Sequence, residues 1–347
     1  NYPENWRPMR EATGRGFTQF GAGEYPMSEP ETRAVVLWTL THPNVGVANS
    51  MDTAVPMHLR GPSTCEETEC MFPADLKWYK HFDSVGVSKT GYPWAGDVYR
   101  TYNTRGGVNP MTGDSLRPAP LFGHGPDYGY FQLGAVWYGD ELWNGGRERD
   151  YDKDGRIEEW EVLRYCDEEY AGKCFKPWTK FNAPGQGEVE TGGFNPKFWS
   201  QNGPPEWLEK WARNQAMFNL YLAQSLPQVE IVSVTSAPVK AAKGAKAPAD
   251  SATHEVKVTV RNSGRLPTAL EQAKRVKIVR PDMVTARAET PNTRMIGRVP
   301  EFWLNGGETR VITLRLKAGP SAADRKLNLR FTSTRGGVVD MEHQIAP

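Results

Sequence analysis

Residues 254–262 read HEVKVTVRN, and apolar and polar side chains alternate along this stretch. A period of two is typical of a β-strand that buries one face. The same alternation recurs in three further stretches, VEIVSV (229–234), TRVITLRLK (309–317) and KLNLRFTST (326–334). Turn residues separate these runs, as in antiparallel sheets. We therefore expect residues 226–347 to form an Ig-like β-sandwich.

The preceding part of the chain is richer in Trp, Gly, Pro and Tyr and carries mixed helix and strand signals. Ser28 and Glu31 have the spacing of a capping box, which predicts that a helix begins there. The apolar run 45–48 predicts a short buried strand. Another helix is predicted to end before Pro227, with an apolar face formed by Trp207, Trp211, Phe218 and Leu222. Together these signals predict an α/β domain over residues 1–225.

Length and charge narrow the function classes. The chain has 347 residues, which at roughly 100–200 residues per domain suggests two domains. The 42 Lys and Arg residues are balanced by 41 Asp and Glu residues, so the strong positive charge of a nucleic-acid-binding protein is absent. No stretch approaches the roughly 18 consecutive apolar residues of a membrane span. The sequence begins with Asn1 rather than Met, and from this we expect a processed or truncated chain.

The four cysteines are spaced as two close pairs. Cys65 and Cys70 enclose a short loop, and Cys166 and Cys174 enclose a slightly longer one. Four cysteines allow three pairings, of which the two local ones are the simplest. Disulfides indicate an exported protein, extracellular or periplasmic, whereas four reduced thiols would indicate a cytosolic one. A zinc site is disfavoured because it requires tighter CxxC-like spacing.

Residues 150–161 read DYDKDGRIEEWE and fit the twelve-residue EF-hand loop. Carboxylates stand at the first, third, fifth and last positions, and a glycine allows the sharp turn. The predicted calcium ligands are Asp150, Asp152, Asp154, Arg156 (through its backbone carbonyl) and Glu161. A helix is expected over residues 160–170. No paired second loop is visible, so a structural role for calcium is favoured over a sensor role, and the alternative is a solvated acidic turn.

Several short stretches of residues 1–225 are informative when they are considered together and in their order along the chain. They are NYPENW (1–6), GAGEYPMSEPETRAV (21–35), HPNVGVANSMDTAVPMHLRGPS (42–63), TGYP (90–93), DYGY (127–130), ELW (141–143) and GGFNPKFWSQNGPPEWL (192–208). This set resembles the zinc carboxypeptidase (funnelin) family, specifically large bacterial members with an appended β-sandwich. The resemblance implies a mixed-sheet α/β domain and hydrolysis of the C-terminal peptide bond of a peptide or protein substrate.

The resemblance also implies a catalytic residue. In the family a zinc ion held by an HxxE pair and a later His polarises the carbonyl group and a bound water. A glutamate beside the metal transfers the proton of that water to the leaving amine. Carried over to this sequence, that general base is Glu141, which follows the apolar run GAVWYG and so fits a buried strand end. The alternative is that Glu141 belongs to a surface turn.

The chain departs from the family pattern at the metal. None of its six histidines belongs to an HxxE motif, and in the family both HxxE and the Asn-Arg pair that holds the substrate carboxylate would precede Asn1. Where the family has His-Thr, this chain has Asp52-Thr53, and His58 is not expected to substitute. Asp52 is therefore a zinc-position residue with an altered ligand.

Two hypotheses follow from this departure. In the first, the chain is a metallocarboxypeptidase-like protein whose incomplete site is completed by an N-terminal chain of the same precursor or by self-assembly. In the second, it is a catalytically silent relative, a pseudoenzyme with a calcium-stabilised structural or peptide-binding role. The change to Asp52 favours the second hypothesis, and the retained Glu141 favours the first.

Overall fold

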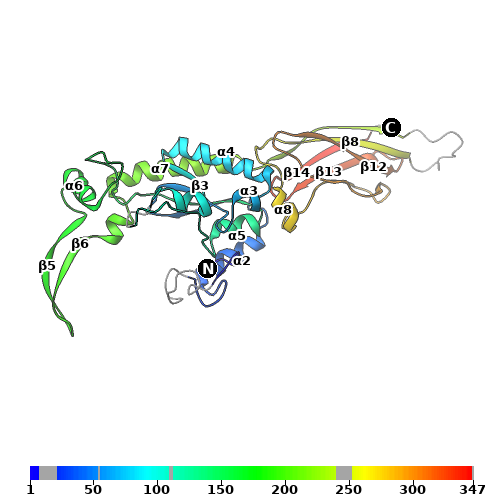
Figure 1. Ribbon diagram of the computed structural model, residues 1–347. Helices are drawn as coiled ribbons and strands as arrows, with labels where there is room; N and C mark the ends of the chain where they lie inside the picture. The colour runs from blue at the N-terminus through cyan, green and yellow to red at the C-terminus, as the bar shows by residue number, and fades with distance from the viewer. Residues whose placement is uncertain (8–21, 54, 109–111, 240–251, 346–347) are drawn as a thin grey trace.

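The computed structural model describes residues 1–7, 22–53, 55–108, 112–239 and 252–345. The protein is a mixed α/β molecule with several sheets, and its two parts lie end to end (Figure 1). The N-terminal part contains a central sheet covered by helices, and the C-terminal part consists almost entirely of strands. No described helix is long and apolar enough to cross a membrane.

The central sheet has four strands in the order β1-β4-β2-β3. Strand β1 (Val47–Asp52) runs parallel to β4 (Val136–Glu141) and forms one edge of the sheet. Strand β2 (Met57–Arg60) is antiparallel to β4 and parallel to β3 (Trp94–Asp97). The sheet is therefore mixed. The strand predicted at 45–48 begins two residues later than expected, and the prediction that it is buried is wrong, because its residues are half-buried or exposed at the edge of the sheet.

Helices cover the two faces of this sheet, because successive side chains of a strand point to opposite faces. Helices α4 (Pro73–Thr90) and α7 (Pro205–Gln224) lie together on one face, and α2 (Pro30–Thr41) and α5 (Gly125–Phe131) lie on the other (Figure 1). Tyr138 of β4 packs in a core cluster with Phe82 of α4 and Phe218 of α7. Its neighbour Trp137 packs instead with residues of α2 and α5.

The predicted helices are present, but the expected capping box is wrong. Helix α2 begins at Pro30, so the residue that precedes it is Glu29 rather than Ser28, and no side chain caps its first turn. The Ser28 hydroxyl donates instead to the Glu29 carboxylate, at 2.9 Å. Proline needs no N–H partner in a first helical turn, and it fixes the start of the helix here and again at Pro205 in α7.

A third region extends from the end of the N-terminal part that is farthest from the C-terminal part. It comprises α6 (Glu159–Tyr170) and a ribbon of two strands, β5 (Phe175–Ala183) and β6 (Gly187–Phe194), which pair only with each other (Figure 1). A disulfide joins Cys166 to Cys174 and ties α6 to the base of the ribbon, and a second joins Cys65 to Cys70. The predicted local pairings are confirmed.

The C-terminal part contains two four-stranded sheets that share one apolar core. The first sheet consists of β10 (Arg294–Ile296), β12 (Thr309–Ala318), β8 (Ala252–Asn262) and β7 (Val229–Pro238). The second consists of β11 (Glu301–Phe302), β9 (Asp282–Ala288), β13 (Lys326–Ser333) and β14 (Gly337–Gln344). Val258 and Leu314 of the first sheet meet Leu329 and Phe331 of the second. All four predicted strands are present.

The two parts are packed firmly against each other. The short helix α8 (Glu271–Val276) contributes Ala273 to the same core cluster as Phe82 and Phe218. The backbone N–H groups of Glu271 and Gln272 both donate to the buried Asp75 carboxylate, at 2.9 Å. In addition, Arg335 donates to backbone carbonyls at the end of α5.

Candidate functional site

Two of the predicted site residues lie side by side in the sheet. Asp52 is the last residue of β1, Glu141 is the last residue of β4, and the two are register partners in a parallel pair. Because partners in register share a face of the sheet, their carboxylates extend on the same side. In open α/β sheets, ligands bind at the carboxyl ends of the strands. This strand end is therefore the candidate site.

The environment of Glu141 favours a carboxyl group that titrates near neutrality. Its side chain is only 8% exposed. Burial, followed by the charge of Asp52, raises the pKa of Glu141 to about 7, while the Val55 N–H and Arg105 act in the opposite direction. The Val55 N–H donates to the Glu141 Oε2 at 3.0 Å and so fixes the carboxylate. A fixed carboxyl group with a pKa near the working pH is suited to proton transfer.

His58 belongs to the opposite face of the sheet. Pairing of β2 with β4 places His58 across from Asp140, with Nδ1 3.0 Å from the Asp140 Oδ2, and both side chains are fully buried. The Nε2 of His58 lies 2.9 Å from the Thr90 hydroxyl. Asp140 also accepts hydrogen bonds from Asn49, at 2.6 Å, and from Gln215 of α7. His58 thus supports the packing beneath the candidate site and does not face Asp52.

The acidic loop is folded around its own carboxylates. Asp150, Asp152 and Asp154 each offer a carboxylate oxygen, and these oxygens lie within 4.8 Å of one another. Asp150 accepts from the backbone N–H groups of Lys153, at 2.5 Å, and Gly155, at 2.8 Å. Gly155 has a φ of +88°, a conformation that glycine adopts without strain. Among the residues that the structure describes, this is the one group of three or more His, Cys, Asp or Glu side chains close enough to hold a metal ion.

Glu161, the predicted last ligand of the loop, is turned toward the backbone. It is fully buried and lies in the first turn of α6, where Glu158 precedes the helix and the two form a reciprocal capping box. Its carboxylate accepts from the N–H of Tyr151, at 2.5 Å, and from the N–H of Glu158, at 2.9 Å. Three carboxylates are therefore close enough to hold an oxygen-coordinated cation, whereas the Glu161 carboxylate is engaged with backbone N–H groups and is not part of this close group.

The fit of the described residues to zinc at the strand end is partial. A catalytic zinc site uses three protein ligands. The strand end brings Asp52 and Glu141 together, and no third His, Cys, Asp or Glu among the described residues completes a close group with them. The described residues alone do not form the family's zinc site.

Two cavities adjoin the strand end. One, of about 730 Å³, lies on the Glu141 side and is lined by Val55, Trp94, Arg105, Arg147 and Trp211, among others, and by Ile157 of the acidic loop. The other, of about 460 Å³, lies on the Asp52 side and reaches Trp143 and Lys197.

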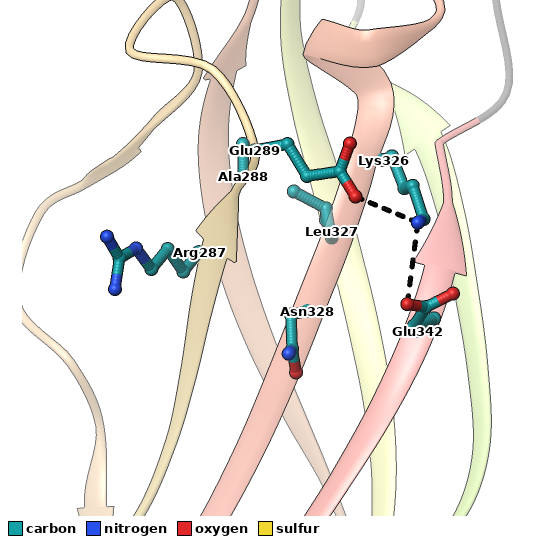
Figure 2. Close-up of a pocket in the computed structure, with 7 residues that line it drawn as sticks. All are labelled: Arg287, Ala288, Glu289, Lys326, Leu327, Asn328 and Glu342. Atoms are coloured by element: carbon teal, nitrogen blue, oxygen red, sulfur yellow. Dashed lines mark hydrogen bonds and ion pairs between the residues drawn. The ribbon is translucent and has the colours of Figure 1, made fainter.

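A third cavity, of about 350 Å³, is lined by residues of the C-terminal part (Figure 2). There the Lys326 Nζ is shared between the carboxylates of Glu289, at 2.8 Å, and Glu342, at 3.4 Å. Arg287 points away from this pair in Figure 2. Its one lysine is already engaged by two carboxylates, and none of the predicted site residues lines this cavity, so it is not the candidate site.

The sequence analysis did not single out Val55, Arg105 or Arg147. Val55 and Arg105 influence Glu141 only because β2 and β3 bring two separate loops to the strand end. Arg147 lies six residues after Glu141 in the sequence. This proximity was the one sequence feature that could have placed Arg147 near the candidate site.

Comparison with known proteins gives limited information. A family model described as a domain of unknown function, DUF8731, matches residues 231–344, which contain most of the strands of the C-terminal part. No curated protein matches the chain. Among solved structures, the crystal structure of a FixG-related protein from Vibrio parahaemolyticus is similar at 11% sequence identity, covering 33% of this chain and 93% of that chain. Its TM-score of 0.21 carries no argument about fold or function.

Proposed function

We propose that this protein is a zinc carboxypeptidase-like protein in which Glu141 is the general base. Residues 1–225 would form its carboxypeptidase-like domain and residues 226–347 an appended Ig-like sandwich. The observation that carries the proposal is the register of β1 with β4, which places Asp52 beside Glu141. The resemblance assigns a metal position to Asp52 and the general base to Glu141, although the two residues are 89 positions apart in the sequence.

The proposed chemistry of the chain's own residues is proton transfer. Glu141 accepts a proton from the water that attacks the carbonyl carbon of the terminal peptide bond. It then delivers that proton to the departing amine as the carbon–nitrogen bond breaks. Its pKa of about 7 suits both steps. Zinc, when bound, supplies Lewis-acid polarisation of the carbonyl and of the water.

The missing zinc ligands are proposed to come from polypeptide that lies alongside β1. This strand has one sheet neighbour among the described residues, so its other edge can accept a further strand. Helices α2 and α7, which cover opposite faces of the sheet, also carry large exposed apolar side chains, including Trp38 and Leu220. A strand added parallel to β1 would end beside Asp52. An N-terminal chain of the same precursor would satisfy this geometry.

An alternative function is that of a catalytically silent, peptide-binding or structural relative stabilised by calcium. It is favoured by the side chain at the proposed metal position, because Asp52 offers a negatively charged carboxylate there in place of the neutral imidazole that the resemblance implies. It is also favoured by the acidic loop, whose three carboxylates already converge. In both functions we propose that the protein is exported, which the two disulfides support.

Metal content and peptide hydrolysis separate the two functions. Purified protein, combined with the completing N-terminal polypeptide of the same precursor, would be analysed for zinc and calcium and then assayed for release of the C-terminal residue from a test peptide, with and without a zinc chelator. Zinc at one ion per chain with chelator-sensitive release supports the enzyme, provided that Glu141→Gln abolishes release without loss of zinc. Calcium without zinc and without release supports the silent alternative.

The identity of residue 52 offers a second test. Asp52→His should raise the affinity for zinc, measured by competition with a chromogenic chelator in the presence of the completing polypeptide. Asp340→His, a change at an exposed residue of β14 in the C-terminal part, is the matched control. Equal effects of the two substitutions would contradict the assignment of Asp52 to a metal position.

A further inference from the structure

The outer face of the first sheet of the C-terminal part carries more positive than negative charge. Buried and outward-facing residues alternate along β8 and β12, as in an antiparallel sheet with one solvated face. Over the four strands the charged residues that face outward are five basic and two acidic ones, namely Lys257, Arg261, Arg294, Arg315, Lys317, Glu230 and Glu255. This face therefore has an excess of three positive charges, whereas the whole chain has a net charge of +1.

Four of the five basic residues form a continuous group, which we call the basic stripe. Lys317 and Arg294 are register partners on neighbouring strands, and Arg315 lies two positions before Lys317. Lys257 lies on the next strand, β8. Among the residues that the structure describes, none of these four makes an ion pair, and Glu255, the half-buried register partner of Arg315, makes none either. The four charges are therefore available to a partner.

Several other basic residues on the outer faces of the C-terminal part have acidic partners. On the same face Arg261 pairs with Glu230, at 3.5 Å, and on the outer face of the second sheet Arg330 pairs with Asp340, at 2.8 Å. In the basic stripe, by contrast, two positive side chains stand directly opposite each other, which destabilises a sheet. An arrangement that opposes stability and that packing does not require indicates a surface with a function.

The basic stripe is too long for one small anion. It crosses three strands, β10, β12 and β8, and also extends along them, so its ends are about 16 Å apart at the backbone. Its charges lie side by side on the sheet and do not surround a common point. A linear polymer with repeated negative groups can contact all four charges, and its weak contacts then reinforce one another.

The neutral side chains around the basic stripe favour a polysaccharide as this polymer. Thr253, Thr259 and Thr313 face outward among the basic residues, and their hydroxyl groups can donate to and accept from sugar hydroxyls. The outward-facing residues of the four strands include no aromatic side chain. Proteins that bind single-stranded nucleic acids use aromatic side chains to stack bases, and membrane-surface segments use them for insertion. Both of these partners therefore fit this face less well.

We propose that the basic stripe binds a linear acidic polysaccharide. Arg294, Arg315, Lys317 and Lys257 contact its negative groups, and the threonines between them contact its hydroxyl groups. Binding involves neither Glu141 nor a metal ion, so this proposal and the proposed function can fail separately.

The test uses the full chain and two oligosaccharides of equal length. One is an oligomer of galacturonic acid, with a carboxylate on each sugar, and the other is its methyl ester, which has no charge. Isothermal titration calorimetry measures both affinities. We expect the acidic oligomer to bind at least about tenfold more tightly than the ester, because each exposed ion pair contributes up to about 1 kcal/mol. This preference should decrease as salt is added, since exposed charges are screened.

Variants connect this binding to the basic stripe. Arg315→Gln combined with Lys317→Gln should weaken the acidic oligomer at least about fivefold and leave the ester unchanged. The control is Arg330→Gln combined with Lys326→Gln, which removes the same charge from the outer face of the second sheet, where both residues are ion-paired. Circular dichroism and the melting temperature show whether each variant is folded.

Three results would overturn the proposal. The first is equal binding of the acidic oligomer and its ester, and the second is an equal effect of the two double variants. The third is tighter binding of single-stranded DNA, or of vesicles that contain phosphatidylserine, than of the acidic oligomer, which would assign the basic stripe to a different partner.

Discussion

Neighbouring residues of β4 have different roles because a strand turns alternate side chains to opposite faces. Asp140 faces helix α7 and is enclosed by hydrogen bonds from Asn49 and Gln215. Glu141 faces the other way and lies beside Asp52, an exposed carboxylate of the same charge. A shift of one residue in the register would exchange these environments. The pairing of β4 with its neighbours therefore decides which acidic residue can act as a base.

The raised pKa of Glu141 makes a prediction about stability. Its pKa in the folded protein, about 7, lies above its ordinary value of 4.5, so the folded state binds the proton more tightly than the unfolded state. The corresponding stabilisation is complete below pH 4.5 and is lost as the pH rises through 7. Glu141→Gln should abolish this pH-dependent loss in the free energy of unfolding, which amounts to at most about 3 kcal/mol. Urea unfolding at intervals from pH 4.5 to pH 8 measures it.

Other buried carboxyl groups titrate in the same range, so the comparison must be with a matched variant. Burial also raises the pKa of Asp127 to about 7. Glu190→Gln, at an exposed residue of β6, should leave the pH dependence of the wild type unchanged. If Glu141→Gln gave the same pH dependence as Glu190→Gln, the environment assigned to Glu141 would be wrong.

Among the elements, the acidic loop and α6 act as a unit. The loop ends in the first turn of the helix, where Glu161 accepts two backbone N–H groups. The helix then ends close to the Cys166–Cys174 disulfide at the base of the β5–β6 ribbon. A cation bound in the loop would therefore brace the attachment of the ribbon as well as one wall of the larger cavity.

Calcium should stabilise the protein through this loop. At a calcium concentration 100-fold above Kd, the expected gain in the free energy of unfolding is about 2.7 kcal/mol. It can be measured by thermal unfolding in calcium and in chelator. Asp150→Asn should abolish the gain. Asp167→Asn, which changes an exposed carboxylate on α6, should preserve it. A wild-type melting temperature that is the same in both media would rule out calcium binding by the folded loop.

At the scale of the whole molecule, the two parts share buried surface and polar contacts. Arg335 reaches from the C-terminal part to the Leu133 and Gly134 carbonyls, at 2.6 and 2.5 Å. Burial lowers the pKa of Arg335 to about 10. A second set of hydrogen bonds has its donors in the C-terminal part and its acceptor in the N-terminal part. Here Asp75 accepts from backbone N–H groups at the start of α8. These contacts orient the parts, and the apolar cluster around Phe218 and Ala273 holds them together.

Removing the Arg335 side chain should loosen this junction. In Arg335→Met the two carbonyls lose their donors while the apolar stem is kept, so the free energy of unfolding should fall by about 2–4 kcal/mol. Arg287→Met, at an exposed residue of β9, should cost less than about 0.5 kcal/mol. Chemical denaturation measures both variants. Equal losses in the two variants would show that the buried contacts of Arg335 contribute little.

Much of the element content could be predicted from local pattern. Alternation identified β7, β8, β12 and β13, because a half-buried strand needs only the correct period. The spacing of Ser28 and Glu31 located the start of α2 to within two residues, and the spacing of the cysteines suggested the two disulfides. The capping box at Ser28 failed because Ser28 and Glu29 bond to each other, a competition that spacing does not reveal.

The amino-acid sequence alone determined the residue types available for chemistry: a glutamate after an apolar run, an aspartate at position 52, and an acidic loop with the spacing of an EF-hand loop. Only the tertiary structure decided which of them meet. Asp52 and Val55, from the segment that joins β1 to β2, and Arg105, from the segment that follows β3, reach Glu141 through the pairing of these strands with β4 and with one another. Strand order and register depend on contacts between residues far apart in the chain, and a local pattern carries no information about such contacts.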